Sequence, residues 1–332
     1  MDLRHHGDRE ATPGLVDLAV NVHPAPMPPW LREAIARSVD DLARYPDPAP
    51  AEAALATHHH RDAGDVLATA GAAEAFTLLA RLRPWRRPVV VHPQFTEPDV
   101  ALVSAGHEPD HVVLDGDFAL DPERVPEDAD LVVVGNPTNP TGARHSAAAI
   151  RSLTRDGRLV VVDEAFNDDG SESLAGERIP GLLVLRSLTK LWAIAGLRAG
   201  YVLGEPKTVA AMRELQPPWS VSTPAAAAMV ACTSPEATRE ATHRDEQVGR
   251  WRDHLQQGLR DHGIEHVPST APFVLARPGT GVHARLRAAG FAVRRCDTFP
   301  GLDDSWVRIA VRPLEVTDEF LRTLADVLPR CR

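Results

Sequence analysis

Short apolar runs recur along the first two-thirds of the chain, and each is long enough for a buried strand. Seven of them are centred near Val66, Val89, Val112, Val132, Val160, Leu183 and Tyr201. A run without polar alternation is typical of a strand that is buried on both faces, as in parallel sheets covered by helices. The pattern therefore predicts a large α/β domain over residues 45–234, with a mostly parallel seven-stranded sheet flanked by helices.

The pattern changes after Ser234-Pro235, where we expect the domain boundary. A charged stretch over 236–262 predicts a helix whose apolar positions are too sparse for full burial. The remaining pattern predicts strand, helix, strand, strand and helix, in this order, over 273–276, 282–289, 291–295, 306–311 and 316–327. We expect this part to form a smaller α+β domain over residues 1–44 and 235–332.

The apolar run at 159–162 ends in a carboxylate, Asp163. Ligands of open α/β sheets bind at the carboxyl ends of the strands, so Asp163 is a candidate site residue. A buried carboxylate is costly unless a cation meets it, and the protonated pyridine nitrogen of pyridoxal phosphate is such a cation. The alternative is that Asp163 caps the start of a helix beyond its strand.

A second strand end carries an amine and two hydroxyl groups. Ser187, Thr189 and Lys190 follow the run at 182–185, and Arg198 returns eight residues after the lysine. Hydroxyls and a guanidinium can bind a phosphate while the amine reacts with an aldehyde, which is the layout of a pyridoxal phosphate lysine. Burial beside Arg198 would lower the pKa of Lys190 and make it nucleophilic. The alternative is an ordinary surface lysine after a strand.

Two further segments favour a cofactor site at these strand ends. The run at 131–134 leads into two Asn-Pro pairs, which make a rigid, non-helical loop that can aim the Asn139 amide at the 3-oxygen of the cofactor. Gly71 separates a short strand from a helix start, whose free N–H groups can bind a phosphate. For Gly71 alone, a plain strand-to-helix turn is the alternative.

In this order, the four segments resemble the fold-type I aminotransferase superfamily of pyridoxal phosphate-dependent enzymes, class I/II. Within it, the chain is similar to the branch of histidinol-phosphate aminotransferases and the threonine-phosphate decarboxylases of cobalamin biosynthesis. The resemblance implies the pyridoxal phosphate-dependent transferase fold, pyridoxal 5'-phosphate as cofactor and a homodimer with shared active sites. It also implies that Lys190 forms the Schiff base, that Asp163 pairs with the pyridinium and that Asn139 donates to the 3-oxygen.

The resemblance assigns further contacts by position. Cofactor contacts would come from Gly71, Ala72, Ala73, Phe95, Ser187, Thr189 and Arg198. Tyr45 matches a tyrosine that reaches the phosphate bound by the partner subunit. Substrate contacts would come from His6, Gly7, Asn21, Arg308 and Arg312. For the His6-Gly7 segment, the alternative is an N-terminal tail without a role in binding.

The chain departs from the family pattern at three positions. Phe166 replaces a common tyrosine, Ala73 lacks a polar side chain, and His23 replaces an asparagine. For the reaction, we predict a threonine-phosphate decarboxylase-like activity, because Arg308 and Arg312 lie four apart on one predicted strand and would anchor two anionic groups. The alternative is a histidinol-phosphate aminotransferase. A regulatory module that binds the cofactor without turnover and a scaffold without cofactor are further alternatives.

Charge and composition exclude some partners. With 36 basic and 46 acidic residues the net charge is -10, and no dense basic block is present, which argues against nucleic acid. We expect no membrane partner, because no apolar stretch is long enough to span a bilayer. Adjacent histidines at 58–60 point apart on a helix, so we expect no metal site. Three widely spaced cysteines suggest reduced thiols in the cytoplasm: Cys232, Cys296 and Cys331.

Overall fold

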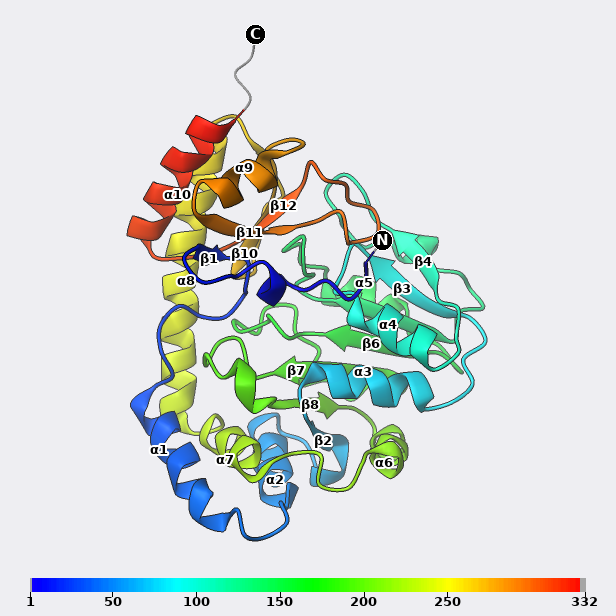
Figure 1. Ribbon diagram of the computed structural model, residues 1–332. Helices are drawn as coiled ribbons and strands as arrows, with labels where there is room; N and C mark the ends of the chain where they lie inside the picture. The colour runs from blue at the N-terminus through cyan, green and yellow to red at the C-terminus, as the bar shows by residue number, and fades with distance from the viewer. Residues whose placement is uncertain (1, 329–332) are drawn as a thin grey trace.

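The computed structural model describes residues 2–328 and contains two β-sheets with helices packed on them (Figure 1). The larger sheet consists, in spatial order, of β2 (Val66–Thr69), β8 (Gly200–Leu203), β7 (Leu182–Ser187), β6 (Leu159–Asp163), β5 (Leu131–Gly135), β3 (Pro88–His92) and β4 (Asp110–Val113). Only β8 runs antiparallel to its neighbours in this sheet. The seven predicted strands and the mostly parallel sheet are therefore confirmed.

Successive residues of the central strands face opposite layers of helices, which explains the absence of polar alternation. Leu131 and Val133 of β5 belong to an apolar cluster with α3 (Ala72–Arg81), α4 (Glu97–Ser104) and α6 (Pro206–Leu215). Val132 and Val134 belong to a second cluster with α2 (Ala49–His58), α5 (Ala147–Ser152) and α7 (Thr223–Ala231). Both faces of the sheet are thus buried, and the carboxyl ends of its strands remain as the place for a site.

The smaller sheet has five strands, in the order β1 (Val16–Leu18), β11 (Phe291–Arg295), β12 (Val307–Ala310), β10 (Phe273–Arg277) and β9 (Glu265–His266). The strand pairs are antiparallel, except that β1 is parallel to β11. Its apolar cluster includes residues of three helices, α8 (Pro235–Asp261), α9 (Val282–Ala288) and α10 (Leu314–Val327). The predicted elements of this part are present, whereas the short strands β1 and β9 were not predicted.

Two helices connect the sheets. In Figure 1, α8 runs along the molecule from the smaller sheet to α7. The helix α1 (Pro29–Ser38) packs against α7 beside the larger sheet, although β1 belongs to the smaller one. The domain boundaries at 44 and 234 therefore remain a prediction. Short 3-10 turns complete the chain: η1 (Gly7–Arg9), η2 (Val39–Asp41), η3 (Ala63–Asp65), η4 (Pro122–Arg124) and η5 (Ala195–Leu197).

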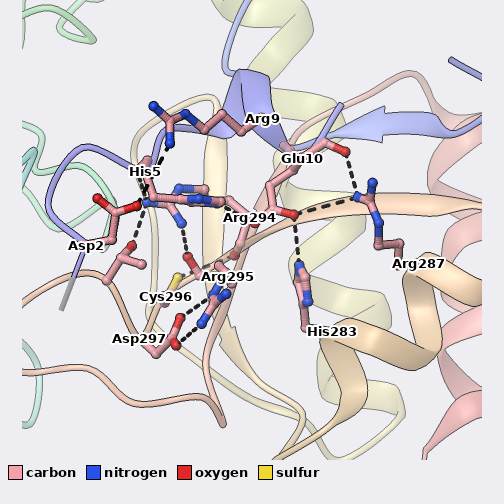
Figure 2. Close-up of polar contacts among 12 residues, drawn as sticks. Asp2, His5, Arg9, Glu10, His283, Arg287, Arg294, Arg295, Cys296 and Asp297 are labelled. Atoms are coloured by element: carbon pink, nitrogen blue, oxygen red, sulfur yellow. Dashed lines mark hydrogen bonds and ion pairs between the residues drawn. The ribbon is translucent and has the colours of Figure 1, made fainter. Parts of the chain in front are cut away.

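The N-terminal segment is tied to the smaller sheet by Glu10. This side chain is 5% exposed and contacts three basic residues, as Figure 2 shows. Its carboxylate lies 2.8 Å from His5 Nε2, 3.2 Å from His283 Nε2 and 3.7 Å from a nitrogen of Arg287. Burial raises the pKa of Glu10, but the hydrogen bonds from His283 and His5 outweigh it and hold the pKa at about 2. The segment is therefore anchored by a buried charge.

Two observations concern the predictions on membranes and thiols. Across residues 2–328, the helices are all too short or too polar to cross a bilayer. Cys232 and Cys296 are buried and free, while Cys331 lies outside the described residues.

Candidate active site

Three segments that follow neighbouring strands meet at one end of the larger sheet. Gly135 of β5 pairs with Asp163 of β6, and Asp163 pairs with Leu185 of β7. These pairs place the loop after β5, the Asp163 carboxylate and the Lys190 loop next to one another. A cavity of about 520 Å³ opens here; among the predicted site residues, it is lined by His6, Gly7, Asn21, Ala73, Phe95, Asn139, Lys190, Arg198 and Arg308.

Lys190 occupies a position in which its amine loses its proton easily. Burial and, after it, the positive charges of Arg308 and Arg198 lower its pKa to about 8, although Asp163 works in the opposite direction. The direction and the causes agree with the expectation from the sequence, with Arg308 as an added contributor. The loop is also fixed by its backbone, because the Lys190 carbonyl accepts a hydrogen bond of 3.0 Å from the amide of His23.

The Asp163 carboxylate does not have a full set of hydrogen-bond partners. Burial raises its pKa to about 6, although the Ala165 amide and the charge of Lys190 work in the opposite direction. One oxygen accepts a hydrogen bond of 3.0 Å from the Ala165 amide. A cation beside the other oxygen would stabilise the ionised form, which is what a protonated pyridine nitrogen provides.

The start of α3 forms an anion cradle. Gly71 precedes the helix with a φ of 80°, and no side chain caps the first N–H groups, so those of Ala72 and Ala73 are available. The Arg198 guanidinium lies directly against Gly71, since a Cβ placed there would be 2.6 Å from Arg198 Nη2. Two hydroxyls stand at the end of β7, Ser187 Oγ and Thr189 Oγ1, 2.8 Å apart. This donor set suits a phosphate group.

Arg308 is held in place by amides and a carbonyl. Its Nη1 donates to Asn139 Oδ1 at 2.6 Å, and a second nitrogen donates to the Ala19 carbonyl. Asn21, with its amide oxygen turned toward the guanidinium, accepts two more hydrogen bonds of 3.1 and 3.2 Å. Within the described part of the chain no carboxylate lies within 4 Å of Arg308, so its charge is free to meet an anionic substrate.

Arg294 was not predicted as a site residue, yet it lines the same cavity. It is 2% exposed and lies directly opposite Arg308 across β11 and β12. Its guanidinium donates to the carbonyl of His5 at 2.5 Å and to Thr298 Oγ1 at 2.6 Å, in the region that Figure 2 shows. The sequence feature that could have indicated Arg294 as a site residue is a charged side chain within the apolar run of 291–295.

The N-terminal segment covers one side of the cavity. His6 Nε2 lies 2.6 Å from a carboxylate oxygen of Glu97, and its ring lies 5.5 Å from that of Phe95. A side chain at Gly7 would collide with the Ala19 carbonyl and approach Arg308. The predicted His6-Gly7 segment therefore lies at the cavity, beside the ring of Phe95.

Two predicted site residues lie elsewhere. Arg312 follows the end of β12, where strand alternation stops, and it donates to backbone carbonyls of Asp17 and Val20 at 2.9 and 2.8 Å. It lines a smaller cavity on the other side of Lys190. Tyr45 is 76% exposed and stacks on the exposed Trp219, with ring centroids 4.3 Å apart, outside the Lys190 cavity of its own chain.

One cluster among residues 2–328 combines three metal-ligating side chains: His92, Asp99 and His111. Asp99 accepts hydrogen bonds from both imidazoles, at 2.9 Å from His92 and 2.7 Å from His111. His92 Nδ1 accepts a hydrogen bond of 3.4 Å from the amide of Gln94, so the ring proton is on Nε2. Nε2 faces Asp99 and is the atom that would have to bind a metal in this cluster. The geometry favours a hydrogen-bonded network here.

The fold and the site define a class, the pyridoxal phosphate-dependent enzymes with a lysine and a carboxylate at the strand ends of a seven-stranded sheet. The family model for aminotransferase class I and II matches residues 13–328, and the chain belongs to this family. These enzymes depend on pyridoxal phosphate, so the predicted family, cofactor and enzyme class are confirmed.

Relatives and solved structures agree with this assignment. A protein of Mycobacterium tuberculosis named histidinol-phosphate aminotransferase is 46% identical over 318 residues, which are 93% of this chain and 87% of its own. The threonine-phosphate decarboxylase of Salmonella typhimurium is 32% identical over 337 residues, with 95% and 91% covered. The structure of the histidinol-phosphate aminotransferase from Clostridium acetobutylicum matches with a TM-score of 0.87 at 25% identity, covering 93% of this chain and 98% of that one.

Proposed function

We propose that the protein is an aminotransferase that acts on histidinol phosphate. The observation that supports it is the Lys190 cavity, in which a buried amine lies among arginines that have no carboxylate partner within the described chain. The similarity to the mycobacterial protein named histidinol-phosphate aminotransferase, at 46% identity, exceeds that to the Salmonella decarboxylase, at 32%. The comparisons thus favour the alternative prediction from the sequence over the decarboxylase.

The residues present fit pyridoxal phosphate. Asp163 would meet the pyridinium nitrogen, and Asn139 would donate to the 3-oxygen, because its amide nitrogen is the end that Arg308 does not use. The phosphate would bind at the start of α3, where Arg198 supplies a positive charge. Once bound, the cofactor supplies an electron sink for the substrate carbon. Lys190 would then hold and move the proton at that carbon.

Arg308 and Arg294 would bind the substrate anions. Two guanidinium groups side by side suit the phosphate of histidinol phosphate in one half of the reaction. They also suit the two carboxylates of an amino acceptor such as 2-oxoglutarate in the other half. Two cationic anchors are therefore as useful to a transaminase as to a decarboxylase of threonine phosphate.

A threonine-phosphate decarboxylase is the second candidate. The observation that favours it is the N-terminal segment, which places His6 beside Phe95 and Gly7 beside Arg308. A substrate with a carboxylate and a phosphate on neighbouring carbons would fill the space between this segment and the two arginines.

We also propose that two copies of the chain share their active sites. Tyr45 and Trp219 form an exposed aromatic stack that does not line the Lys190 cavity of the same chain. Aromatic side chains are enriched in interfaces, and the family resemblance places Tyr45 at the phosphate of the partner subunit. An active monomer in sedimentation experiments would contradict this part of the proposal.

The test uses the fact that the chain contains only two lysines, Lys190 and Lys207. Borohydride reduction of the protein loaded with pyridoxal phosphate should attach the cofactor to Lys190, as read by peptide mass. Lys190→Ala should lose turnover, while the exposed Lys207→Ala keeps it. Histidinol phosphate with 2-oxoglutarate should give amino transfer. Release of CO₂ from threonine phosphate without amino transfer would replace the first candidate by the second, and labelling of Lys207 would refute both.

A further inference from the structure

Asp168, in the loop after β6, lies between two hollow spaces. The first, which we call the inner cavity, lies beside Lys190 and Phe166. The second, the outer cavity, has a volume of about 530 Å³ and is bounded by α2 and the start of α8. Gly170 and Thr238 line the outer cavity and are exposed, so it reaches solvent. Asp168 lines both spaces and therefore lies between the Lys190 side and the cavity that reaches solvent.

The inner cavity is lined by apolar and polar side chains and has the size of a water molecule. The space that the centre of a water can occupy is about 20 Å³, and one water needs roughly 10–15 Å³ in this measure. Among residues 2–328, six buried side-chain atoms lack a hydrogen-bond partner, and three of them line this cavity: His23 Nε2, Arg144 Nε and Arg252 Nε. Unpartnered nitrogens around a space of this size indicate a bound water.

The imidazole of His23 is a donor toward this cavity. Its Nδ1 accepts a hydrogen bond of 3.1 Å from the Ala25 amide, which leaves the ring proton on Nε2. The side chain is 8% exposed, and burial lowers its pKa to about 4, so the ring stays neutral. A water that accepts a hydrogen bond from His23 keeps one acceptor site for an incoming proton and two hydrogens to donate, and carboxylates line the same cavity.

Asp168 is suited to exchange a proton near neutral pH. Burial and the negative charges of Asp245 and Asp169 raise its pKa to about 7, although Arg186 works in the opposite direction. The pKa of Lys190 is lowered to about 8. Two pKa values this close correspond to about a tenfold difference in proton affinity, so neither group holds a proton much more tightly than the other.

Except for Asp245, the other charged groups around the inner cavity are already engaged in hydrogen bonds. Arg144 is paired with Asp169 at 2.8 and 2.9 Å, and the guanidinium groups of Arg252 and Arg312 donate to backbone carbonyls. Asp245 contributes a second carboxylate from α8, whose pKa burial also raises. The N-terminal segment and a bound substrate would fill the opposite side of the amine, so a proton needs a separate path.

We propose that Asp168 relays protons between the Lys190 side of the active site and solvent, through one water in the inner cavity and then the outer cavity. The inference rests on the proposed function, because it requires Lys190 to be the reacting amine. A substrate arrives as an ammonium ion and reacts as a free amine. The proton that it loses would pass through the water to the Asp168 carboxylate, and the neutral Asp168 would release it to water in the outer cavity.

The test compares Asp168→Asn and Asp168→Ser with the unchanged enzyme. We expect kcat at neutral pH to fall by roughly 100-fold, the lower end of the range for a positioned proton-transfer group, with a larger solvent deuterium isotope effect and unchanged KM. Imidazole in the buffer should restore part of the kcat of Asp168→Ser, because the shortened side chain leaves room for it. Independently of turnover, carboxyl ¹³C spectra of the cofactor-free protein should lose one signal that titrates near pH 7.

Asp156→Asn is the matched control, since it makes the same charge change at an exposed carboxylate that lines neither the inner nor the outer cavity. It should keep kcat and show no dependence on imidazole. If Asp168→Asn keeps the kcat, pH profile and isotope effect, the relay is refuted. A fall in kcat without rescue and without a changed isotope effect refutes it as well, because a structural defect gives that result. An active Lys190→Ala would instead refute the proposed function.

Discussion

Glu10→Gln removes the buried charge that anchors the N-terminal segment. In the folded protein the pKa of Glu10 falls from 4.5 to about 2. A pKa difference of one corresponds to about 1.36 kcal/mol, so the ionised carboxylate stabilises the fold by about 3 kcal/mol. The side chain is 5% exposed, so little of this is lost to solvent screening. We expect the free energy of unfolding at pH 7 to fall by about this amount in the variant.

The pH dependence has a defined sign. Because the folded pKa lies below the unfolded one, the stabilisation is fully present above about pH 4.5 and is lost as the pH falls toward 2. The unchanged protein should therefore lose stability over this window, while Glu10→Gln should show a flatter profile. Since the segment carries His6 and Gly7 to the active-site cavity, KM for the phosphorylated substrate should also rise.

Urea unfolding followed by linear extrapolation measures the difference, and Glu108→Gln is the control, because Glu108 is exposed. The control should change the free energy of unfolding by less than about 0.5 kcal/mol, as surface substitutions usually do. A Glu10→Gln protein that unfolds like the control at pH 7, with the same loss of stability between pH 4.5 and 2, would refute the reasoning.

Three further changes follow from the geometry. Gly71→Ala should weaken pyridoxal phosphate binding at least about tenfold, or ~1.4 kcal/mol, because the residue has a φ of 80° and its Cβ would displace the Arg198 guanidinium; absorbance titration measures it. Arg294→Ala should raise KM for the phosphorylated substrate while the affinity for pyridoxal phosphate, titrated separately, stays the same, because Arg294 lines the cavity but not the cradle at α3. Asp99→Asn should lower the free energy of unfolding by about 1–3 kcal/mol, because the amide keeps one acceptor oxygen, whereas the carboxylate accepts hydrogen bonds from two imidazoles. The variant's stability, measured by urea unfolding, should also depend less on pH, in acid and in base. In the unchanged protein, hydrogen bonds from the imidazoles lower the pKa of Asp99 despite its burial, so the stabilisation by Asp99 is lost in acid. The hydrogen bond to Asp99 raises the pKa of His111, so the stabilisation by His111 is lost as the pH rises through its folded pKa.

The strands of the larger sheet were predictable because both of their faces are buried. A strand such as β5 then has no polar position, and its apolar run is visible without knowledge of its neighbours. The same logic located Asp163 and Lys190, since each follows the end of such a run. The strands β1 and β9 have three and two residues, which is too short for any pattern to register.

The position of Arg294 depends on information that the local sequence lacks. It lies opposite Arg308 because β11 and β12 pair in one particular register across the connecting loop. Arg312 fails as a partner of Arg308 for a related reason, because β12 ends at Ala310 and the alternation of side chains ends with it. Asp168 lies outside every strand, and only the packing of α8 against its loop creates the cavities on its two sides.

The net charge of the chain also does not predict the charge of its active-site cavity. The chain as a whole carries a net charge of -10, yet its active-site cavity is lined by Lys190, Arg198, Arg294 and Arg308. Burial is the largest of the causes that lower the pKa of Lys190, Arg294 and Arg308. Keeping these buried groups charged therefore costs the folded protein free energy. Anions that bind there remove this cost. A phosphorylated cofactor and an anionic substrate should therefore stabilise the fold as well as react in it.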